Sequence, residues 1–220
     1  MRGVLARKRK MVDGEVQFHL DRFKATGADL IRGEARFEAP KRVAVHLNDG
    51  GRRTITGDRV FLDLGSRPTI PDIAGLAAAK PMTHVEALDL DRLPEHVIIL
   101  GGGYVGLELA QALRRFGSEV TVITHGRQIA SKEDPDVAQA LLETFTTEGI
   151  EVLLETRVRE VQGLSGRKVS VRVENSQGED TIEGTDLLVA TGRTPNTRGI
   201  GLETAGIELD PRGYIKVNDR

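Results

Sequence analysis

The sequence has 220 residues, with 31 Lys and Arg against 33 Asp and Glu, so its formal net charge is −2. This balance creates no overall positive field, and we therefore expect no nucleic-acid partner. No run approaches the roughly 18 apolar residues of a membrane-spanning helix, and no apolar stretch of a secretory signal follows the basic start. We predict a cytoplasmic protein without a membrane partner.

Two residue types limit the chemistry further. The sequence has no cysteine, which excludes disulfides, thiolate metal sites and thiol nucleophiles within these residues. None of its five histidines has a neighbour at metal-ligand spacing, so we predict no metal site.

The N-terminal segment is strongly basic. Its cationic residues are Arg2, Arg7, Lys8, Arg9 and Lys10. They could form an arm for nucleic acid or membrane, or the solvated face of a helix. Apolar residues recur at helical spacing from Val4 to Phe23, which favours a helix over about the first 24 residues.

Short strands are expected next, at residues 30–31, 35–37, 43–47, 53–56 and 60–64. The turn sequence Asn48-Asp49-Gly50-Gly51 predicts a hairpin between the third and fourth of them. Residues 66–94 contain four prolines and are expected to cross between two domains.

A βαβ pattern begins at residue 96. Strands are expected at 96–100, 120–123, 151–154 and 187–190, with helices at 104–116 and from Asp134-Pro135 to Gly149. Alternating valines at 169, 171 and 173 predict a three-strand meander over about 151–183. The pattern indicates an α/β fold with a parallel sheet that binds its ligand at the carboxyl ends of the strands.

A glycine-rich turn joins the first strand and helix of this pattern. It reads Gly101-Gly102-Gly103-Tyr104-Val105-Gly106. Gly101 permits a tight turn, Gly103 lets a pyrophosphate approach the backbone, and Gly106 lets the helix pack closely on the strand. The helix N-terminus adds free N–H groups and a positive dipole end. The motif predicts a dinucleotide site; the alternative is a glycine turn without a ligand.

The end of the second strand bears on which dinucleotide binds. An Asp or Glu there would accept a hydrogen bond from a ribose 2′-hydroxyl and favour NAD. The sequence instead has Thr124 and His125, followed two residues later by Arg127. The cationic groups favour a 2′-phosphate, and hence NADPH over NADH. The alternative is that Arg127 is a surface charge and NADH also binds.

The chain resembles the pyridine nucleotide–disulfide oxidoreductases, the family that includes mercuric reductase, dihydrolipoyl dehydrogenase and glutathione reductase. Three motifs carry the resemblance, at residues 64–71, 101–108 and 188–196. It implies a Rossmann-like three-layer NAD(P)-binding domain over residues 81–190, with an incomplete FAD-binding domain formed by 1–80 and by 191–220. Residues 120–122 and the helix at Asp134 are most similar to the mercuric reductase branch.

The resemblance also implies roles for single residues. Glu108 matches the family's catalytic carboxylate near the nicotinamide and flavin, and Tyr104 matches an aromatic residue that covers the nicotinamide pocket. Val158 matches a backbone contact to adenine. The loop between nicotinamide and flavin matches Ala190, Gly192 and Arg193. Ala35 and Gly65 match flavin contacts, although Asp63-Leu64-Gly65 departs from the family's Ala-Thr-Gly.

Several family features are missing from these residues: the first FAD glycine turn, the Cys-x-x-x-x-Cys pair and the dimerisation domain through which the parent enzymes form homodimers. We therefore expect a central fragment that binds NAD(P)H without turnover and holds FAD weakly or not at all. The parent activity would pass electrons from NAD(P)H through FAD to a disulfide or metal substrate. Alternatives are a non-catalytic nucleotide-binding or interaction protein and a stand-alone Rossmann dehydrogenase.

Overall fold

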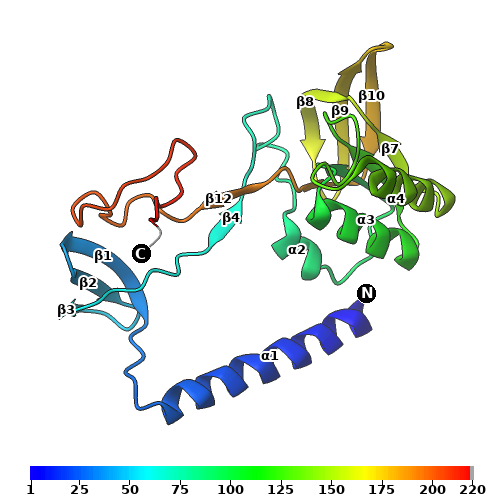
Figure 1. Cartoon of the computed structure of the whole chain (residues 1–220). Helices are drawn as coiled ribbons and strands as arrows, with labels where there is room; N and C mark the ends of the chain where they lie inside the picture. Colours follow the sequence, from blue (N-terminus) through cyan, green and yellow to red (C-terminus); the bar gives the residue numbers. More distant parts are fainter. Residues whose placement is uncertain (219–220) are drawn as a thin grey trace. The chain divides into compact units, whose positions relative to one another are not determined.

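A computed structural model describes residues 1–218, which form two compact units (Figure 1). The first unit comprises Met1–Lys8 and Pro68–Arg193, and the second comprises Arg9–Arg67 and the segment from Thr194 onward. The domain boundaries expected from the resemblance, after residues 80 and 190, stay predictions.

A parallel sheet forms the centre of the first unit. Its four strands, in spatial order, are β11 (Asp186–Val189), β5 (His96–Leu100), β6 (Glu119–Ile123) and β7 (Glu151–Leu153). The apolar runs in β11, β5 and β6 are buried on both faces, as expected for a parallel sheet covered from both sides, whereas the apolar residues of the edge strand β7 are half-buried.

Helices cover one face of this sheet and an antiparallel meander covers the other. Val97 and Ile99 of β5 pack in the cluster that includes helices α3 (Tyr104–Phe116) and α4 (Pro135–Thr147). Ile98 and Leu100 pack in the opposite cluster, with valines of the meander, because successive strand side chains point to opposite faces. The three layers confirm the predicted Rossmann-like α/β fold.

The meander consists of β8 (Arg157–Leu164), β9 (Lys168–Asn175) and β10 (Gly178–Gly184). Figure 1 shows these three strands side by side. Val169, Val171 and Val173 are all buried, so the predicted alternation faces the core. The strands begin six residues later than the predicted start of the meander at residue 151, which is the first residue of the parallel strand β7.

The ends of the long helices follow local chemistry. Helix α3 ends at Gly117, whose φ of 114° is readily adopted only by glycine, and α4 begins at Pro135 after Asp134. Helical spacing after Asp134 predicts an inner face of Val137, Leu141 and Phe145. Phe145 is buried and Leu141 packs against the same apolar cluster, whereas Val137 is 44% exposed and its neighbour Ala138 is buried instead.

A short helix, α2 (His84–Leu88), was not predicted. Thr83 and Glu86 form a capping box, in which each side chain satisfies a backbone N–H near the other residue. This Thr-x-x-Glu spacing is visible in the sequence and could have identified the helix. The hydrogen bond from the Thr83 side chain lowers the pKa of Glu86.

The second unit contains most of helix α1 (Arg2–Ala25) and an antiparallel sheet of β1 (Gly33–Ala39), β2 (Arg42–Leu47) and β3 (Arg52–Thr56). The predicted hairpin is confirmed, with Arg42 opposite Thr56. The strands expected at 30–31 and 60–64 are absent; Phe61 is 88% exposed and has no partner strand. β4 (Ser66–Pro68) pairs with β12 (Arg193–Pro195) where the chain passes between the units.

Helix α1 confirms the helical interpretation of the basic segment, but its apolar residues are not core residues. Among them only Leu5 is buried, while Met11, Val12 and Val16 are all more than 40% exposed. No helix among residues 1–218 is both long enough and apolar enough to cross a bilayer.

A buried carboxylate ties α2 and its flanking loop to the sheet. Asp186, fully buried at the start of β11, accepts a bond of 3.1 Å from the Arg92 guanidinium and a second, shorter one from the same group. The Thr185 hydroxyl also donates to it, at 2.9 Å. Removal of Arg92 would leave this carboxylate buried without its counter-charge.

We predict that Arg92→Leu lowers the free energy of unfolding by about 2–3 kcal/mol, below the roughly 3–5 kcal/mol of a fully buried pair because the Arg92 side chain is 45% exposed. Urea denaturation measures this change. The control is Lys168→Ala, which breaks an exposed pair with Glu183 and should cost less than about 1 kcal/mol. Equal effects of the two substitutions would contradict the prediction.

Candidate functional site

The glycine turn lies between β5 and α3 at the carboxyl edge of the parallel sheet. Gly101 has φ of 115°, and a Cβ there would lie 2.4 Å from the carbonyl oxygen of Ala190. A Cβ on Gly106 would lie 2.3 Å from the carbonyl oxygen of Gly101. Both distances are too short for any side chain, so the two glycines permit the helix, the strand and the 190–192 segment to approach one another.

Gly103 differs from these glycines. It is the N-cap residue of α3, no side chain caps the helix there, and a Cβ would meet nothing within 4 Å. The space before the first turn of α3 is therefore open. Free backbone N–H groups and the positive end of the helix dipole border that space, an arrangement that favours a phosphate group.

Two loops flank the turn. The backbone N–H of Ala130 donates to the Gly102 carbonyl at 2.8 Å, which fixes the 125–134 loop beside the turn. The N–H of Thr124 donates to Leu153, and the N–H of Thr156 donates back to Thr124, each at 3.0 Å. The segments that follow β6 and β7 thus lie side by side at the sheet edge.

These segments enclose a cavity of about 680 Å³, within the size range of small-molecule sites. Eight residues predicted from the sequence line it: Gly101, Gly102, Gly103, Thr124, His125, Val158, Ala190 and Gly192. The other predicted residues of this unit do not: Tyr104, Val105, Gly106, Glu108, Arg127 and Arg193. The structure therefore brings together the turn, the end of β6, the start of β8 and the end of β11.

The cavity lining is polar and cationic where the loops meet. Arg157 and Arg159 line it together with Gln128 and Ser131, and none of the acidic residues among residues 1–218 does so. Sequence reasoning missed these four residues. The available signal was their position after the second and third parallel strands, whose carboxyl ends share an edge with the glycine turn.

Arg127, the predicted 2′-phosphate group, contacts another side chain. Its Nε lies 3.4 Å from a carboxylate oxygen of Glu155, and the Arg127 side chain is 91% exposed. Glu155 follows β7 and has the left-handed φ of 49°. The prediction for Arg127 stays a prediction, and the guanidinium has a competing partner here.

Tyr104 and Glu108 both lie on the exposed side of α3. The Tyr104 hydroxyl donates to the Glu133 carboxylate, and this bond raises the pKa of Tyr104. Glu108 is exposed, and no side-chain partner is present among the described residues. Their predicted roles beside nicotinamide and flavin stay predictions.

The segment after β11 continues along the cavity. Ala190 donates its N–H to Leu100 at 2.8 Å, and the Gly192 carbonyl accepts from Thr69 at 3.0 Å. Gly192 has φ of 139°, and a Cβ there would meet nothing within 4 Å. The backbone here is therefore held in place while its cavity-facing side remains open.

The predicted flavin contacts lie in the second unit. Ala35 is exposed on β1, opposite Val45, and Gly65 is exposed just before β4 with φ of 61°. Their roles stay predictions, and we derive no flavin chemistry from them.

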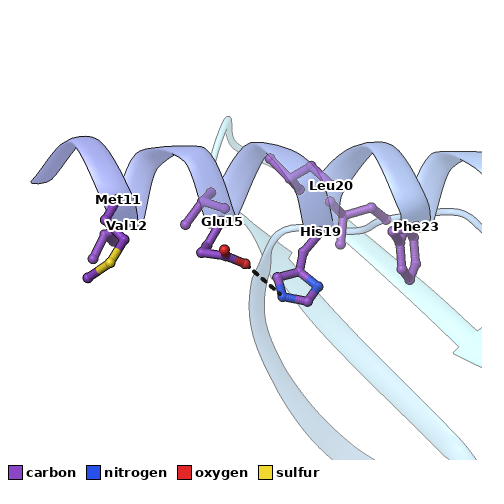
Figure 2. Close-up of a pocket in the computed structure, with 8 residues that line it drawn as sticks. Met11, Val12, Glu15, His19, Leu20 and Phe23 are labelled. Atoms are coloured by element: carbon purple, nitrogen blue, oxygen red, sulfur yellow. Dashed lines mark ion pairs between the residues drawn. The ribbon is translucent and has the colours of Figure 1, made fainter. Parts of the chain in front are cut away.

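A second hollow, of about 580 Å³, lies along helix α1 (Figure 2). Apolar side chains form most of it, and its only polar side chains are those of Glu15 and His19, whose carboxylate and ring nitrogen lie 3.8 Å apart. A dinucleotide phosphate would be repelled by the Glu15 carboxylate here and would find no group of free backbone N–H donors among the lining residues. The chemistry of a dinucleotide fits the glycine-turn cavity instead.

The fold and the turn define this chain as a Rossmann-type α/β protein. Residues 7–220 match the family described as pyridine nucleotide-disulphide oxidoreductase, and the chain belongs to that family. The family implies FAD and a nicotinamide dinucleotide as its cofactors.

Similar proteins agree with this assignment. A mercuric reductase of Acidithiobacillus ferrooxidans is 40% identical over 189 residues, which are 86% of this chain and 34% of that protein. A dihydrolipoamide dehydrogenase of Chaetomium thermophilum is 36% identical over 203 residues, which are 89% of this chain and 39% of that protein.

Among solved structures, the HOCl-induced flavoprotein disulfide reductase RclA from Escherichia coli superposes with a TM-score of 0.86 at 28% identity, over 97% of this chain and 48% of that one. A Cu(II) complex of the same protein superposes with a TM-score of 0.88 at 27% identity, over 99% of this chain and 48% of that one. This chain thus spans less than half the length of each relative described here.

We predict that Gly106→Ala destabilises the first unit by more than about 2 kcal/mol, because its Cβ would clash with the Gly101 carbonyl. Gly103→Ala is the matched control, since its Cβ enters open space, and should change the free energy of unfolding by less than about 1 kcal/mol. Urea denaturation compares the two. Equal destabilisation would contradict the close contact at Gly106.

We predict that Glu133→Ala lowers the pKa of Tyr104, because the hydrogen bond to that carboxylate stabilises the protonated phenol. The sequence has no tryptophan and two tyrosines, so a Tyr214→Phe background leaves Tyr104 as the single phenol. Ultraviolet titration of phenolate formation measures the pKa. Lys132→Ala is the control, and an unchanged Tyr104 pKa in Glu133→Ala would contradict the assignment.

Proposed function

We propose that this chain binds NADPH in the glycine-turn cavity and acts as the nicotinamide side of an FAD-dependent oxidoreductase. One observation carries the proposal: Gly103 opens onto the cavity while Gly101 and Gly106 are closed by backbone contacts. The tight turn alone requires Gly101 and Gly106, whose Cβ atoms would clash with backbone. Glycine at the open position 103 is needed only if another group occupies the space beside it.

The preference for NADPH follows from charge. The place after β6 where an acid would accept from a 2′-hydroxyl holds Thr124, whose hydroxyl accepts from the Gly126 N–H. Cationic side chains line the cavity and carboxylates do not. A dianionic phosphate is stabilised in these surroundings, whereas a neutral 2′-hydroxyl gains little.

When bound, the nicotinamide would supply the hydride, which is chemistry of the cofactor. The residues of this chain bind and orient it. The N-terminus of α3 would hold the pyrophosphate, Val158 would lie along the adenine, and the Ala190–Gly192 backbone would border the nicotinamide. In the proposal, electrons pass through flavin to a disulfide or metal substrate, in a cytoplasmic homodimer.

Within these 220 residues we propose binding without turnover, because no cysteine is available to form the redox dithiol. The same observation favours the second candidate, a non-catalytic nucleotide-binding protein of this family. Flavin absorbance tests the absence of turnover: a stoichiometric yellow protein that oxidises NADPH would contradict both candidates.

We predict that Gly103→Val weakens binding of NADPH and NADH at least about 100-fold, because the side chain would occupy the pyrophosphate position. Isothermal titration calorimetry measures the affinities, and a melting temperature close to that of the wild type shows that the fold is intact. Val105→Ala, on the outward side of α3, serves as the control. Retained affinity in Gly103→Val would show that the nucleotide binds elsewhere.

A further inference from the structure

The loops after β6 and β7 form the end of the cavity that lies farthest along the sheet from β11. In a Rossmann unit the group at the end of the second strand contacts the adenosine ribose. Hydrogen bonds between Thr124 and Thr156, and between Gly126 and Glu155, place the loop after β7 beside that group. Residues of both loops can therefore reach the ribose.

Three arginines belong to these loops or to the strand that follows, and their partners differ. The Arg127 guanidinium lies beside Glu155, is almost wholly exposed and does not line the cavity. Arg159 lines the cavity, but its guanidinium is bonded to Glu174 on β9. Each of these two positive charges thus has a carboxylate partner already.

Arg157 is different. Arg157 is exposed to solvent and lines the cavity. Within residues 1–218 its guanidinium has neither a hydrogen bond nor an ion pair. Val158, the predicted adenine contact, is its neighbour in the chain. An unpaired guanidinium at this place can bind a phosphate through two parallel N–H donors without first breaking an ion pair.

We propose that Arg157, rather than Arg127, is the specificity-determining residue that binds the 2′-phosphate of NADPH. The inference rests on the proposed nucleotide site and adds the group that recognises the extra phosphate. Glu155 has a defined part in it: it pairs with Arg127 outside the cavity, while Arg157 has no ion pair within residues 1–218.

The test compares Arg157→Gln with the matched control Arg127→Gln in the full chain, by calorimetric titration with NADPH and with NADH. For Arg157→Gln we expect NADPH affinity to fall about 10- to 100-fold, as for loss of a charge-assisted bidentate contact, while NADH affinity changes less than about threefold. For Arg127→Gln we expect the affinities for both nucleotides to change by less than about threefold. Arg157→Lys should retain part of the NADPH affinity, because lysine keeps the positive charge but lacks the two parallel N–H donors of the guanidinium.

The outcomes separate the inference from the proposed function. If the wild type binds both nucleotides and Arg157→Gln lowers both equally, or if Arg127→Gln has the larger selective effect, the inference is overturned and the nucleotide site stands. If the wild type binds neither nucleotide, the proposed function and this inference both fail. The same titrations with adenosine 2′,5′-bisphosphate and adenosine 5′-monophosphate test the 2′-phosphate without the nicotinamide half. Equal affinities of the wild type for these two ligands would also overturn the inference.

Discussion

The arrangement of this site depends on one close approach of backbone to backbone. At position 101 a Cβ would clash with the Ala190 carbonyl, and at position 106, in the first turn of α3, it would clash with the Gly101 carbonyl. Because the helix starts so near the strand ends, its free N–H groups point into the cavity rather than into a longer connecting loop. A wider separation would leave room for side chains there and would close the space in which we propose that the pyrophosphate binds.

The strand beneath the turn explains why the first unit is rigid enough to hold this geometry. Alternate residues of β5 enter two separate apolar clusters, one with the helices and one with the meander. Burial on both faces fixes the strand against a register slip, since a shift of one residue would exchange the two clusters. The glycine turn is therefore attached to a strand that is packed on both faces, while most of the other cavity-lining residues come from the loops at the sheet edge and from the start of β8.

Charge then gives the cavity its chemical preference. No carboxylate from the described part of the chain lines it, although acidic residues outnumber basic ones in the sequence as a whole. The Glu155 and Glu174 carboxylates lie near it but are paired with Arg127 and Arg159. The local field at the cavity is set by which arginines remain unpaired, and net charge is a poor guide to it.

The sequence by itself determined the elements whose signals are local: the strand–turn–helix at residues 96–116, the helix stop at Gly117 and the hairpin over 43–56. Each depends on glycine conformation or on short-range periodicity. Only the tertiary structure decided that Val137 of α4 is exposed, that no strand forms at 60–64 and that Arg127 pairs with Glu155, since these depend on partners distant in sequence. The sequence placed a cation after the second strand, but only the packing of neighbouring segments shows which arginines line the cavity.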